Sequence, residues 1–497
     1  MYQIILLCLC SGLLLTFVTP SFGLWPLIFF AFCPLFFAIE KLTDHNSYSL
    51  AKCYGSGVVF GFIFSMSCFY WISNLSLLTM LAVTLAYALI YGLFVPGVVI
   101  GKKNGLDGTS QALWTICLWV SLEVLLSDVF WPIPSIAIGY GLWSAAELIQ
   151  LADITGVFGI SFWVLAVNLV VFVVIKQRIK KNITFIGLVI LATLFIVGYG
   201  LERKSWYRDQ FHKKESFRIN SIFSSVLTED KQKLKTEIFS ILKQKTILSI
   251  KETSKKVDLA IWPETSVPVY LRSVREREYI DGLTDLAKTQ QVPILLGALS
   301  FERDKENSIK KYNSAFLVPE KGFVSQEYRK NILVPFHESV FNRGDGPVSI
   351  KIAGKFNFGV LICYELLFPN FVREIANKNN GFLVNITNDQ MAFENIWPAY
   401  NIPVPHLVFR VVENRKYLVR SANWGHSMVI TPTGHIVQES GIGTTGYLSK
   451  DIQLNTVETF FSKNGFLLGK SLLILTLLWA VTGYAVKKIS SMNLKYF

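Results

Sequence analysis

The sequence predicts two parts of different fold class, a polytopic α-helical membrane domain and a layered α/β domain. The chain has 497 residues, of which 52% are hydrophobic, and its mean hydropathy is +0.41. Most long apolar runs lie in residues 1–200, whereas residues 201–465 alternate short strand-like runs with more polar stretches. Hydropathy this high and this uneven excludes a chain made only of soluble domains.

Eight apolar runs are expected to cross a membrane, since a span needs about 20 apolar residues, with a range of about 17–25. They lie at residues 4–19, 24–39, 54–72, 75–100, 112–131, 157–175, 183–199 and 466–486. The first run has no basic segment before it and is followed at once by another apolar run, so we interpret it as a span and not as a signal peptide. The predicted division is a membrane domain at 1–200 with about seven helices, a soluble domain at 201–465, and an eighth helix with a tail at 466–497.

Basic residues in the loops predict the orientation of the spans. All eight Lys and Arg of residues 1–200 follow the second, fourth and sixth spans, namely Lys41, Lys52, Lys102, Lys103, Lys176, Arg178, Lys180 and Lys181. The alternate loops carry acidic residues such as Asp128, Glu147 and Asp153, and the eighth span is followed by Lys487, Lys488 and Lys495. By the positive-inside rule, both termini are expected to be cytoplasmic and the soluble domain to lie outside.

The net charge of +13 does not require a nucleic-acid partner, and we expect none. Part of the charge is topogenic, and the rest is spread through the soluble domain as a solvated face or as an attraction to anionic headgroups. Only one of the seven cysteines, Cys363, lies in the soluble domain. In an oxidising compartment, a lone thiol is either buried and inert or reactive.

The soluble domain is predicted to alternate strands with helices. Strand-like runs lie at 257–264, 293–300, 313–320, 356–365, 381–389, 416–423 and 427–434, the last with a hairpin signal at 432–434. After the first run, one helix is predicted from apolar residues that share a face, Leu271, Val274, Ile280, Leu283, Leu286 and Ala287. Two more helices fit between Pro369 and Lys378 and near 404–415. We interpret 200–218 as a polar connection from the membrane and 453–465 as the return linker.

Three residues near the ends of strand-like runs carry the groups of an acyl-transferring site. Cys363 ends the run in FNFGVLICYE, Glu264 lies in WPETSVP and Lys330 in YRKNILVPF. A thiolate is a nucleophile, a partly buried carboxylate can act as general base, and an ammonium can stabilise a developing oxyanion. Each residue alone also fits a structural role, as a core cysteine, a capping or surface carboxylate, and a solvated lysine.

Taken together, the order and context of these motifs resemble the nitrilase superfamily. The separations of 66 and then 33 residues fit that family's Glu–Lys–Cys triad. The resemblance implies that Glu264 is the general base, Lys330 stabilises the tetrahedral intermediate and Cys363 is the nucleophile. It also implies supporting roles for Glu338, Tyr364 and Glu365, an αββα sandwich fold, and neither a cofactor nor a metal.

A nitrilase-like domain between the seventh and eighth of eight spans is similar to the apolipoprotein N-acyltransferases. Further matches are NITND (385–389) and ENRKYLVRSAN (413–423), which carry Glu413, Arg415, Arg420 and Asn423. The resemblance implies transfer of an acyl chain from a membrane phospholipid, through a thioester, to the N-terminal amine of a diacylglyceryl-cysteine apolipoprotein. It implies a place in the bacterial inner membrane with the catalytic domain on the periplasmic side. Eight spans exceed what an anchor needs and suggest a lateral chamber for acyl chains.

Several positions depart from this family's pattern. His337 stands where a glycine is usual before the second glutamate, and the proline usually found shortly after that glutamate is absent, with Phe341 nearby. The segment 390–392 is Gln-Met-Ala in place of an aromatic–aromatic–glycine loop. INSIFSSVLTED (219–230) has neither the family's Gln-Gly-Asn segment nor its Lys-Trp pair, and His406 is aligned with the family's histidine but follows Pro405. We expect these changes around the entrance of the site.

Two other functions fit the same residues. A membrane-held nitrilase-like amidase or hydrolase would use the same thioester with water as acceptor. A catalytically silent lipid-binding homologue would keep the fold alone. A transporter is disfavoured, because the acidic residues of 1–200 mostly lie at span ends, with Glu123 the main exception.

Overall fold

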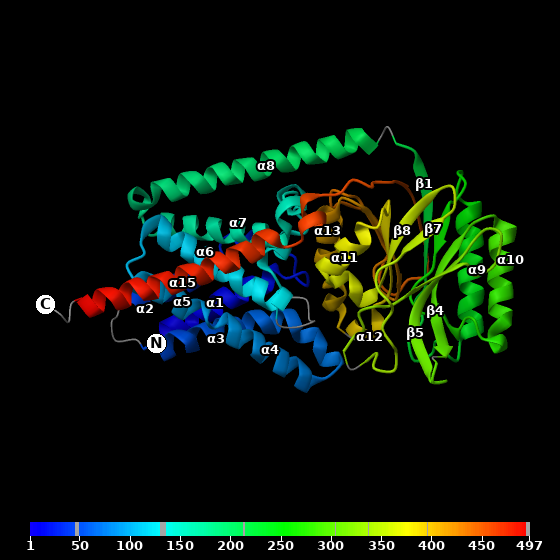
Figure 1. The fold of residues 1–497 in the computed structure, drawn as a ribbon, viewed down its shortest axis with the longest axis horizontal. Helices are drawn as coiled ribbons and strands as arrows, with labels where there is room; N and C mark the ends of the chain where they lie inside the picture. The colour runs from blue at the N-terminus through cyan, green and yellow to red at the C-terminus, as the bar shows by residue number, and fades with distance from the viewer. Residues whose placement is uncertain are drawn as a thin grey trace. The chain divides into compact units, whose positions relative to one another are not determined.

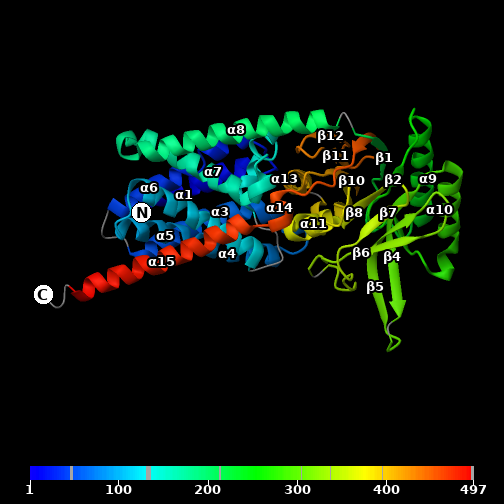
Figure 2. The ribbon, with the colours of Figure 1, turned by 45° about the horizontal axis from the view of Figure 1, so that its top comes forward.

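A computed structural model describes residues 1–44, 49–129, 136–211, 214–303, 305–335, 337–394 and 396–493. Its contacts divide the chain into two compact units, Met1–Glu202 with Phe466–Phe497, and Arg203–Gly465. The first unit is helical and the second combines sheets with helices (Figures 1 and 2).

Unit 1 consists of helices joined by short loops and turns. They are α1 (Tyr2–Val18), α2 (Cys33–Asp44), α3 (Leu50–Phe69), α4 (Leu77–Tyr91), α5 (Phe94–Lys103), α6 (Gly108–Val124), α7 (Ala152–Ile175), α8 (Ile183–Phe211) and α15 (Leu467–Asn493). The break between α4 and α5 precedes Pro96, whose missing N–H ends the ladder of the preceding helix. The predicted fourth span thus forms two consecutive helices.

Within the described residues, six helical segments are long and apolar enough to cross a membrane. They are Trp25–Asp44, Leu50–Asn74, Leu77–Lys103, Gly108–Ser127, Ala152–Ile175 and Ile179–Gln210. Two shorter apolar helices, Tyr2–Val18 and Leu467–Thr482, lie where the first and eighth spans are predicted. This pattern agrees broadly with about eight spans.

The core of unit 1 is aromatic. The fully buried Trp119 packs against the rings of Phe32, Phe60, Phe64, Tyr91 and Phe94. Beside this cluster, the carboxylate of Glu123 accepts hydrogen bonds from Trp119 Nε1 at 2.8 Å and from the Ile138 N–H at 2.7 Å. A buried carboxylate held in this way has a structural role. The side chains of Asp128, Lys487, Lys488 and Lys495 lie outside the described part of the chain.

Unit 2 contains two β-sheets. A seven-stranded sheet has the order β13-β1-β2-β4-β5-β6, with β3 paired to β4. Its strands are β1 (Ser216–Phe223), β2 (Leu259–Ile261), β3 (Val267–Tyr270), β4 (Ile294–Arg303), β5 (Ile309–Val318), β6 (Gln326–Arg329) and β13 (Gly446–Gln453). A six-stranded sheet has the order β12-β11-β10-β9-β8-β7. Its strands are β7 (Ser349–Ile352), β8 (Phe356–Ile362), β9 (Phe382–Asn388), β10 (Tyr417–Asn423), β11 (Met428–Ile430) and β12 (Ile436–Glu439).

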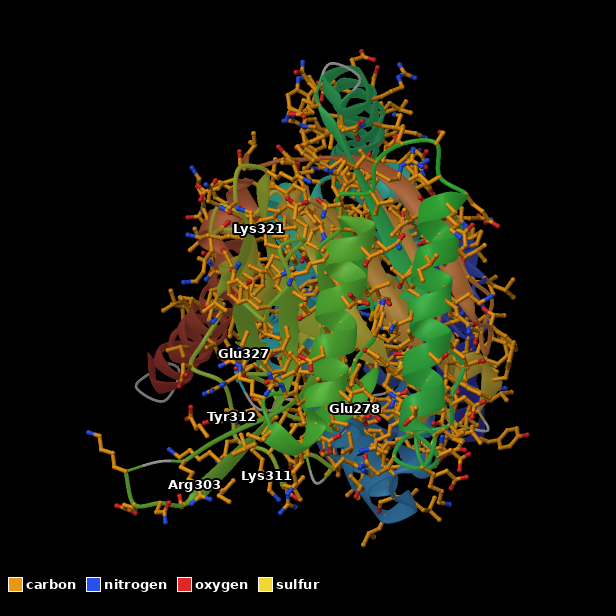
Figure 3. The ribbon with its side chains drawn as sticks, turned by 90° about the vertical axis from the view of Figure 1, so that its right-hand side faces the viewer. Glu278, Arg303, Lys311, Tyr312, Lys321 and Glu327 are labelled. Atoms are coloured by element: carbon orange, nitrogen blue, oxygen red, sulfur yellow. The ribbon has the colours of Figure 1, made fainter. Side chains whose placement is uncertain are left out.

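Helices cover the outer faces of both sheets. α9 (Lys235–Lys251) and α10 (Arg277–Gln290) lie side by side on the first sheet (Figures 1 and 3), and α11 (Pro369–Ala376) and α13 (Pro403–Asn414) lie on the second. The shorter helices are α12 (Gln390–Phe393) and α14 (Phe460–Asn464). The predicted αββα sandwich is therefore confirmed.

Small polar residues join the two sheets where β1 meets β10. Ser221 Oγ donates to the Arg420 carbonyl at 3.0 Å, and Ser421 Oγ donates to the Ile222 carbonyl at 2.6 Å. These side chains let the backbones approach closely, so that the ends of β1 and β10 are held in fixed register.

Three local predictions differ from the structure. The helix expected from Leu271 begins only at Arg277, because β3 and a 3-10 turn come first, and Val274 is 88% exposed. The chain at 200–211 continues α8 as a helix, since Glu, Arg and Lys are good helix formers. The helix α9 was not predicted, and its buried face includes only Ile238, Leu242, Thr246 and Ser249.

Candidate active site

The nucleophile candidate lies at a sharp turn between a strand and a helix. Cys363 follows the last residue of β8 and begins the 3-10 helix Cys363–Leu367 (η8). Its φ is 50°, a left-handed conformation that a non-glycine residue adopts at a cost. The neighbouring strand β9 is parallel to β8, so Asn388 at its end lies at the same edge of the sheet. This geometry presents a partly exposed thiol at the edge of the second sheet.

Glu264 comes from the first sheet and meets the second through a backbone contact. It follows β2, and the next residue, Thr265, has a φ of 44°. Glu264 Oε2 accepts the N–H of Asn388 at 2.9 Å. Gly297 lies so close to this turn that an added Cβ would be 2.5 Å from the Thr265 nitrogen. The turn of Glu264 is therefore enclosed, and the residue is 5% exposed.

Lys330 joins two buried carboxylates. Its Nζ lies 3.3 Å from Glu264 Oε1 and 2.8 Å from Glu338 Oε1. Glu338 Oε2 accepts the N–H of Val334 at 2.8 Å, which closes the loop between the lysine and the second glutamate. Burial by itself would lower the Lys330 pKa, but the opposing charges of Glu264, Cys363 and Glu338 outweigh it and raise the pKa. Lys330 is thus a fixed positive charge.

Asn313 on β5 is a fourth member of this cluster that sequence reasoning missed. Its Nδ2 donates to Glu264 Oε1 at 2.8 Å and to Glu338 Oε1 at 3.1 Å. Its backbone carbonyl accepts the backbone N–H of Lys330 at 2.9 Å. Its only signal in the sequence is a polar amide at the start of the apolar segment NSAFLV, which gives no hint of its partners.

The surroundings of Cys363 keep its thiol protonated at rest. Dense packing around the sulfur and then the charge of Glu264 raise the pKa of Cys363 to about 12, against the lowering effect of Lys330. Thr387 makes a hydrogen bond to Cys363 that also lowers the pKa. Because few thiols are ionised under these conditions, attack by Cys363 requires a base that accepts its proton during the reaction.

Glu365 joins the cysteine turn to the lysine loop. Its Oε2 accepts the Ile362 N–H at 2.7 Å and the Tyr328 hydroxyl at 2.8 Å, and its Oε1 accepts the Asn331 N–H at 2.5 Å and the Ile332 N–H at 3.3 Å. Burial raises the pKa of Glu365 to about 7. One donor precedes Cys363 and the other three lie on both sides of Lys330, so Glu365 holds the segments of Cys363 and Lys330 together. Tyr364 packs edge-on against Phe368, with ring centroids 5.0 Å apart.

A second polar network supports the ends of β9 and β10. Arg420 Nη2 lies 2.6 Å from both oxygens of Asp389, and Thr387 Oγ1 donates to Asp389 Oδ1 at 2.9 Å. Asn423 Nδ2 donates to Asn388 Oδ1 at 2.9 Å. The network therefore leads from β10 to the backbone amide that contacts Glu264.

Comparison with known proteins shows which enzymes this chain resembles. The family model described as Apolipoprotein N-acyltransferase N-terminal domain matches residues 11–170, and the model described as Carbon-nitrogen hydrolase matches residues 235–460. An apolipoprotein N-acyltransferase of Geobacter metallireducens is 29% identical over 93% of this chain and 91% of its own length. The relative of the same name from Bdellovibrio bacteriovorus is 29% identical over 86% of this chain and 84% of its own length.

The chain is therefore similar to the apolipoprotein N-acyltransferases over most of its length. Among solved structures it resembles Nit3 of Saccharomyces cerevisiae, a member of branch 10 of the nitrilase superfamily, with 20% identity and a TM-score of 0.40. That match covers 48% of this chain and 90% of Nit3.

The candidate site contains a second buried lysine that sequence reasoning missed. Lys231 is 5% exposed, and its Nζ donates to the Glu264 carbonyl at 3.1 Å and to Thr265 Oγ1 at 3.0 Å. Burial lowers the pKa of Lys231 to about 8, against the raising effect of the Glu264 and Cys363 charges. It lies just after the segment 219–230, which lacks the family's usual motif. That segment reaches the site through other atoms, such as Thr228 Oγ1, which accepts from Asn388 Nδ2 at 3.0 Å.

The residues that depart from the family's pattern occupy different places. His337 is exposed and Phe341 is half-buried, next to the loop of Glu338. Gln390 is buried instead of lying at an entrance, because its Oε1 accepts the N–H and the hydroxyl of Thr228 at 2.6 and 2.5 Å. The side chain of Met391 lies outside the described part, and Ala392 belongs to α12.

The remaining motif residues make structural contacts in unit 2. Glu413 pairs with Arg410 at 2.8 Å inside α13, where both are fully buried. Arg415 stacks on the Tyr207 ring at 5.1 Å. Burial and the charge of Arg410 lower the pKa of His406 to about 3, so His406 is neutral, and it is half-buried on α13. The match of His406 to the family's histidine stays a prediction.

Proposed function

We propose that this chain is an apolipoprotein N-acyltransferase, which transfers an acyl chain from a membrane phospholipid to the N-terminal amine of a diacylglyceryl-cysteine apolipoprotein. The observation that carries the proposal is one cluster of Cys363, Glu264 and Lys330 in a chain that also has a matching membrane domain. A membrane domain of this size suits two substrates that are both anchored in lipid.

In the first half-reaction, Glu264 takes the thiol proton while Cys363 Sγ attacks the ester carbonyl carbon of the phospholipid. The carbonyl oxygen of the ester becomes an oxyanion, and the Lys330 ammonium supplies positive charge next to it. The intermediate collapses with cleavage of the carbon–oxygen ester bond, and the proton on Glu264 passes to the leaving lysophospholipid. The product is a thioester on Cys363.

In the second half-reaction, the neutral amine of the lipoprotein attacks the thioester carbonyl. Glu264 removes a proton from the nitrogen, the carbon–sulfur bond breaks, and the thiolate regains a proton to restore Cys363. Hydrogen bonds from Asn313 and to Glu338 fix the positions of Glu264 and Lys330. Both half-reactions can therefore use Glu264 and Lys330 in the same positions. Separating the two substrates in time avoids the need to hold both lipids at once.

We also propose the orientation given by the charged loops. Both termini are cytoplasmic, the catalytic unit lies on the periplasmic side of the bacterial inner membrane, and Cys363 meets its substrates at the outer leaflet. The support is the placement of all the basic residues of 1–200 in alternate loops.

Intact-mass measurement of the purified protein mixed with phospholipid tests the reaction. We expect an acyl-sized adduct on the wild type that hydroxylamine removes, and none on Cys363→Ala. Addition of a diacylated lipopeptide with a free amine should discharge the adduct into a triacylated product, while the same lipopeptide with an acetylated amine should not. Discharge to free fatty acid at the same rate with both peptides would favour a hydrolase, and no adduct at all would favour a silent homologue.

A further inference from the structure

Two hollows in unit 1 lie end to end along one face of α7. A hollow of about 480 Å³ is lined on α7 by Phe158, Phe162 and Ala166, among others. A second, of about 900 Å³, is lined on the same helix by Leu169, Phe172 and Val173. These positions follow each other at intervals of three and four, which keeps them on one helix face. Thr109 at the start of α6 lines both hollows, so they adjoin there as well.

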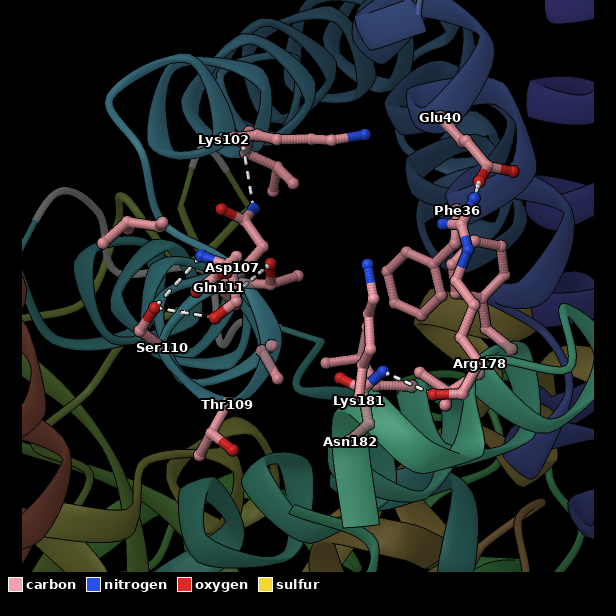
Figure 4. Close-up of a pocket in the computed structure, with 18 of the residues that line it drawn as sticks. Phe36, Glu40, Lys102, Asp107, Thr109, Ser110, Gln111, Arg178, Lys181 and Asn182 are labelled. Atoms are coloured by element: carbon pink, nitrogen blue, oxygen red, sulfur yellow. Dashed lines mark hydrogen bonds and ion pairs between the residues drawn. The ribbon is translucent and has the colours of Figure 1, made fainter. Parts of the chain in front are cut away.

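The larger hollow has a basic mouth. Lys102, Arg178 and Lys181 line it, together with the carboxylates of Glu40 and Asp107. Figure 4 shows the ammonium ends of Lys102 and Lys181 pointing into the opening. Glu40 is already paired twice, with Arg178 at 2.6 Å and with Lys176 at 2.8 Å. Lys102 has an exposed ion pair with Asp44 at 3.5 Å. Lys181 has no ion pair within the described residues, so its positive charge in the mouth is left to be neutralised.

The smaller hollow is almost wholly apolar and lies between α6, α7, α8 and α15. Its wall on α8 includes Leu188 and Phe195, which remain 54% and 59% exposed. The hydroxyl of Thr155, one of the few polar groups in its lining, already donates to the Leu151 carbonyl at 3.2 Å. Water finds few hydrogen-bond partners in such a space, whereas a hydrocarbon chain fits it.

We propose that these hollows bind one anionic phospholipid, with its phosphate in the basic mouth and an acyl chain in the apolar hollow. The order of charge and apolar surface along α7 matches the order of headgroup and tail. Basic pockets between helices on the cytoplasmic side of a membrane recognise anionic headgroups. A free phosphate would satisfy the lysines but leave the apolar hollow unfilled, so the lipid is the occupant.

This lipid is distinct from the acyl donor. The mouth lies at the start of α8, and residues 183–202 of that helix extend about 30 Å before the chain enters unit 2. That length is the thickness of the hydrocarbon core, so the headgroup belongs to the leaflet opposite the junction with unit 2. The bound lipid therefore stabilises the packing of α8 against the other helices of unit 1. It is not a substrate of the acyl transfer.

Lipid binding to the full-length protein tests the proposal. Delipidated protein in mild detergent is titrated with phosphatidylglycerol or phosphatidylcholine, and bound lipid is counted by native mass spectrometry. We expect the wild type to retain phosphatidylglycerol preferentially and the double variant Lys102→Gln/Lys181→Gln to bind it about tenfold more weakly. The matched control is Lys103→Gln/Lys180→Gln, which removes the same charge from adjacent positions that do not line the hollow. Equal losses in both pairs would overturn the proposal.

Filling the apolar hollow tests the acyl-chain part separately. Ala192 on α8 lines the hollow, so Ala192→Trp should weaken phosphatidylglycerol binding, while Leu194→Trp on the outward face of α8 should not. Competition by inorganic phosphate, with no effect of Ala192→Trp, would reassign the mouth to a free anion. Thioester formation on Cys363 is measured in parallel and should persist in all four variants, so a failure of the lipid site is distinguishable from a failure of catalysis.

Discussion

At the residue scale, Lys330 and Asn313 hold together two carboxylates that would otherwise repel each other. Glu264 and Glu338 each accept from both donors with one oxygen and accept a backbone N–H with the other. The two carboxylates therefore have nearly the same bonding. They differ in their relation to the thiol, because the carboxylate whose charge raises the Cys363 pKa most is that of Glu264.

This similarity gives a matched pair of variants. Glu264→Gln and Glu338→Gln each replace one carboxylate oxygen by an amide that faces a backbone N–H, so both should lower the melting temperature by a similar amount. Only Glu264→Gln removes the group that we propose takes the thiol proton, and it should slow adduct formation by about 10²–10⁴. Rates of adduct formation from intact mass measure this difference. Equal rate losses in the two variants would contradict the assignment of Glu264 as base.

The Lys231 ammonium is predicted to lose its proton at a pH of about 8. Its folded pKa of about 8 lies below the ordinary value of 10.5. The unfolded chain therefore binds more protons between these pH values, and the contribution of Lys231 to stability rises as the pH increases through that window. The wild type should gain melting temperature relative to Lys231→Met between pH 7 and pH 10, as measured by thermal unfolding in detergent.

The activity of the same variant separates two roles for Lys231. As a positioning residue for the Glu264 turn, it should support adduct formation most strongly when protonated, so the wild-type rate should fall above about pH 8. Lys231→Met should be slower and lack this fall. If the rate of Lys231→Met still falls above about pH 8, as in the wild type, Lys231 only supports the fold.

At the element scale, Glu365 sets the spacing of two loops from different sheets. One loop follows β6 and carries Lys330, and the other follows β8 and carries Cys363. All four contacts to Glu365 are donors, three of them backbone N–H groups. Only a carboxylate accepts from all of them at once. The Glu365 carboxylate thus links two loops that strand pairing does not join.

This connection can be weakened in steps. Tyr328→Phe removes one donor and leaves the others, so it should reduce adduct formation only a few-fold. Glu365→Gln turns an amide toward donors and leaves buried N–H groups without an acceptor, each at about 1–3 kcal/mol. It should abolish adduct formation while the far-ultraviolet circular dichroism persists. Equal activity in both variants would refute the role of Glu365 as the link.

At the scale of the whole molecule, the charge pattern of unit 1 and the position of the insertion predict which side of the membrane carries the catalytic unit. Reporter fusions measure this orientation. Alkaline phosphatase, active only outside the cytoplasm, should be active when fused after Asn307 in the β4–β5 hairpin and inactive after Lys181. A fluorescent protein that folds only in the cytoplasm should give the reverse. The opposite pattern at both positions would reject the proposed orientation.

The sequence by itself determined the repeated apolar runs, the alternation of their basic loops, and the three motifs around Glu264, Lys330 and Cys363. These features are local, because a span needs only contiguous apolar residues and each motif is a few residues long. Seven strands of unit 2, β2, β4, β5, β8, β9, β10 and β11, were predicted for the same reason, whereas β1, β3, β6, β7, β12 and β13 were not. The amphipathic face of α9 was too narrow to indicate a helix.

Only the tertiary structure decided how the motifs cooperate. Asn313, 49 residues from Glu264, and Lys231, 33 residues from it, enter the site through strand pairing and burial. The N–H of Asn388, 124 residues away, reaches the same carboxylate because β9 ends at the edge where the two sheets meet. A polar residue shows its chemistry in the sequence, but its partners depend on the topology that brings distant strand ends together.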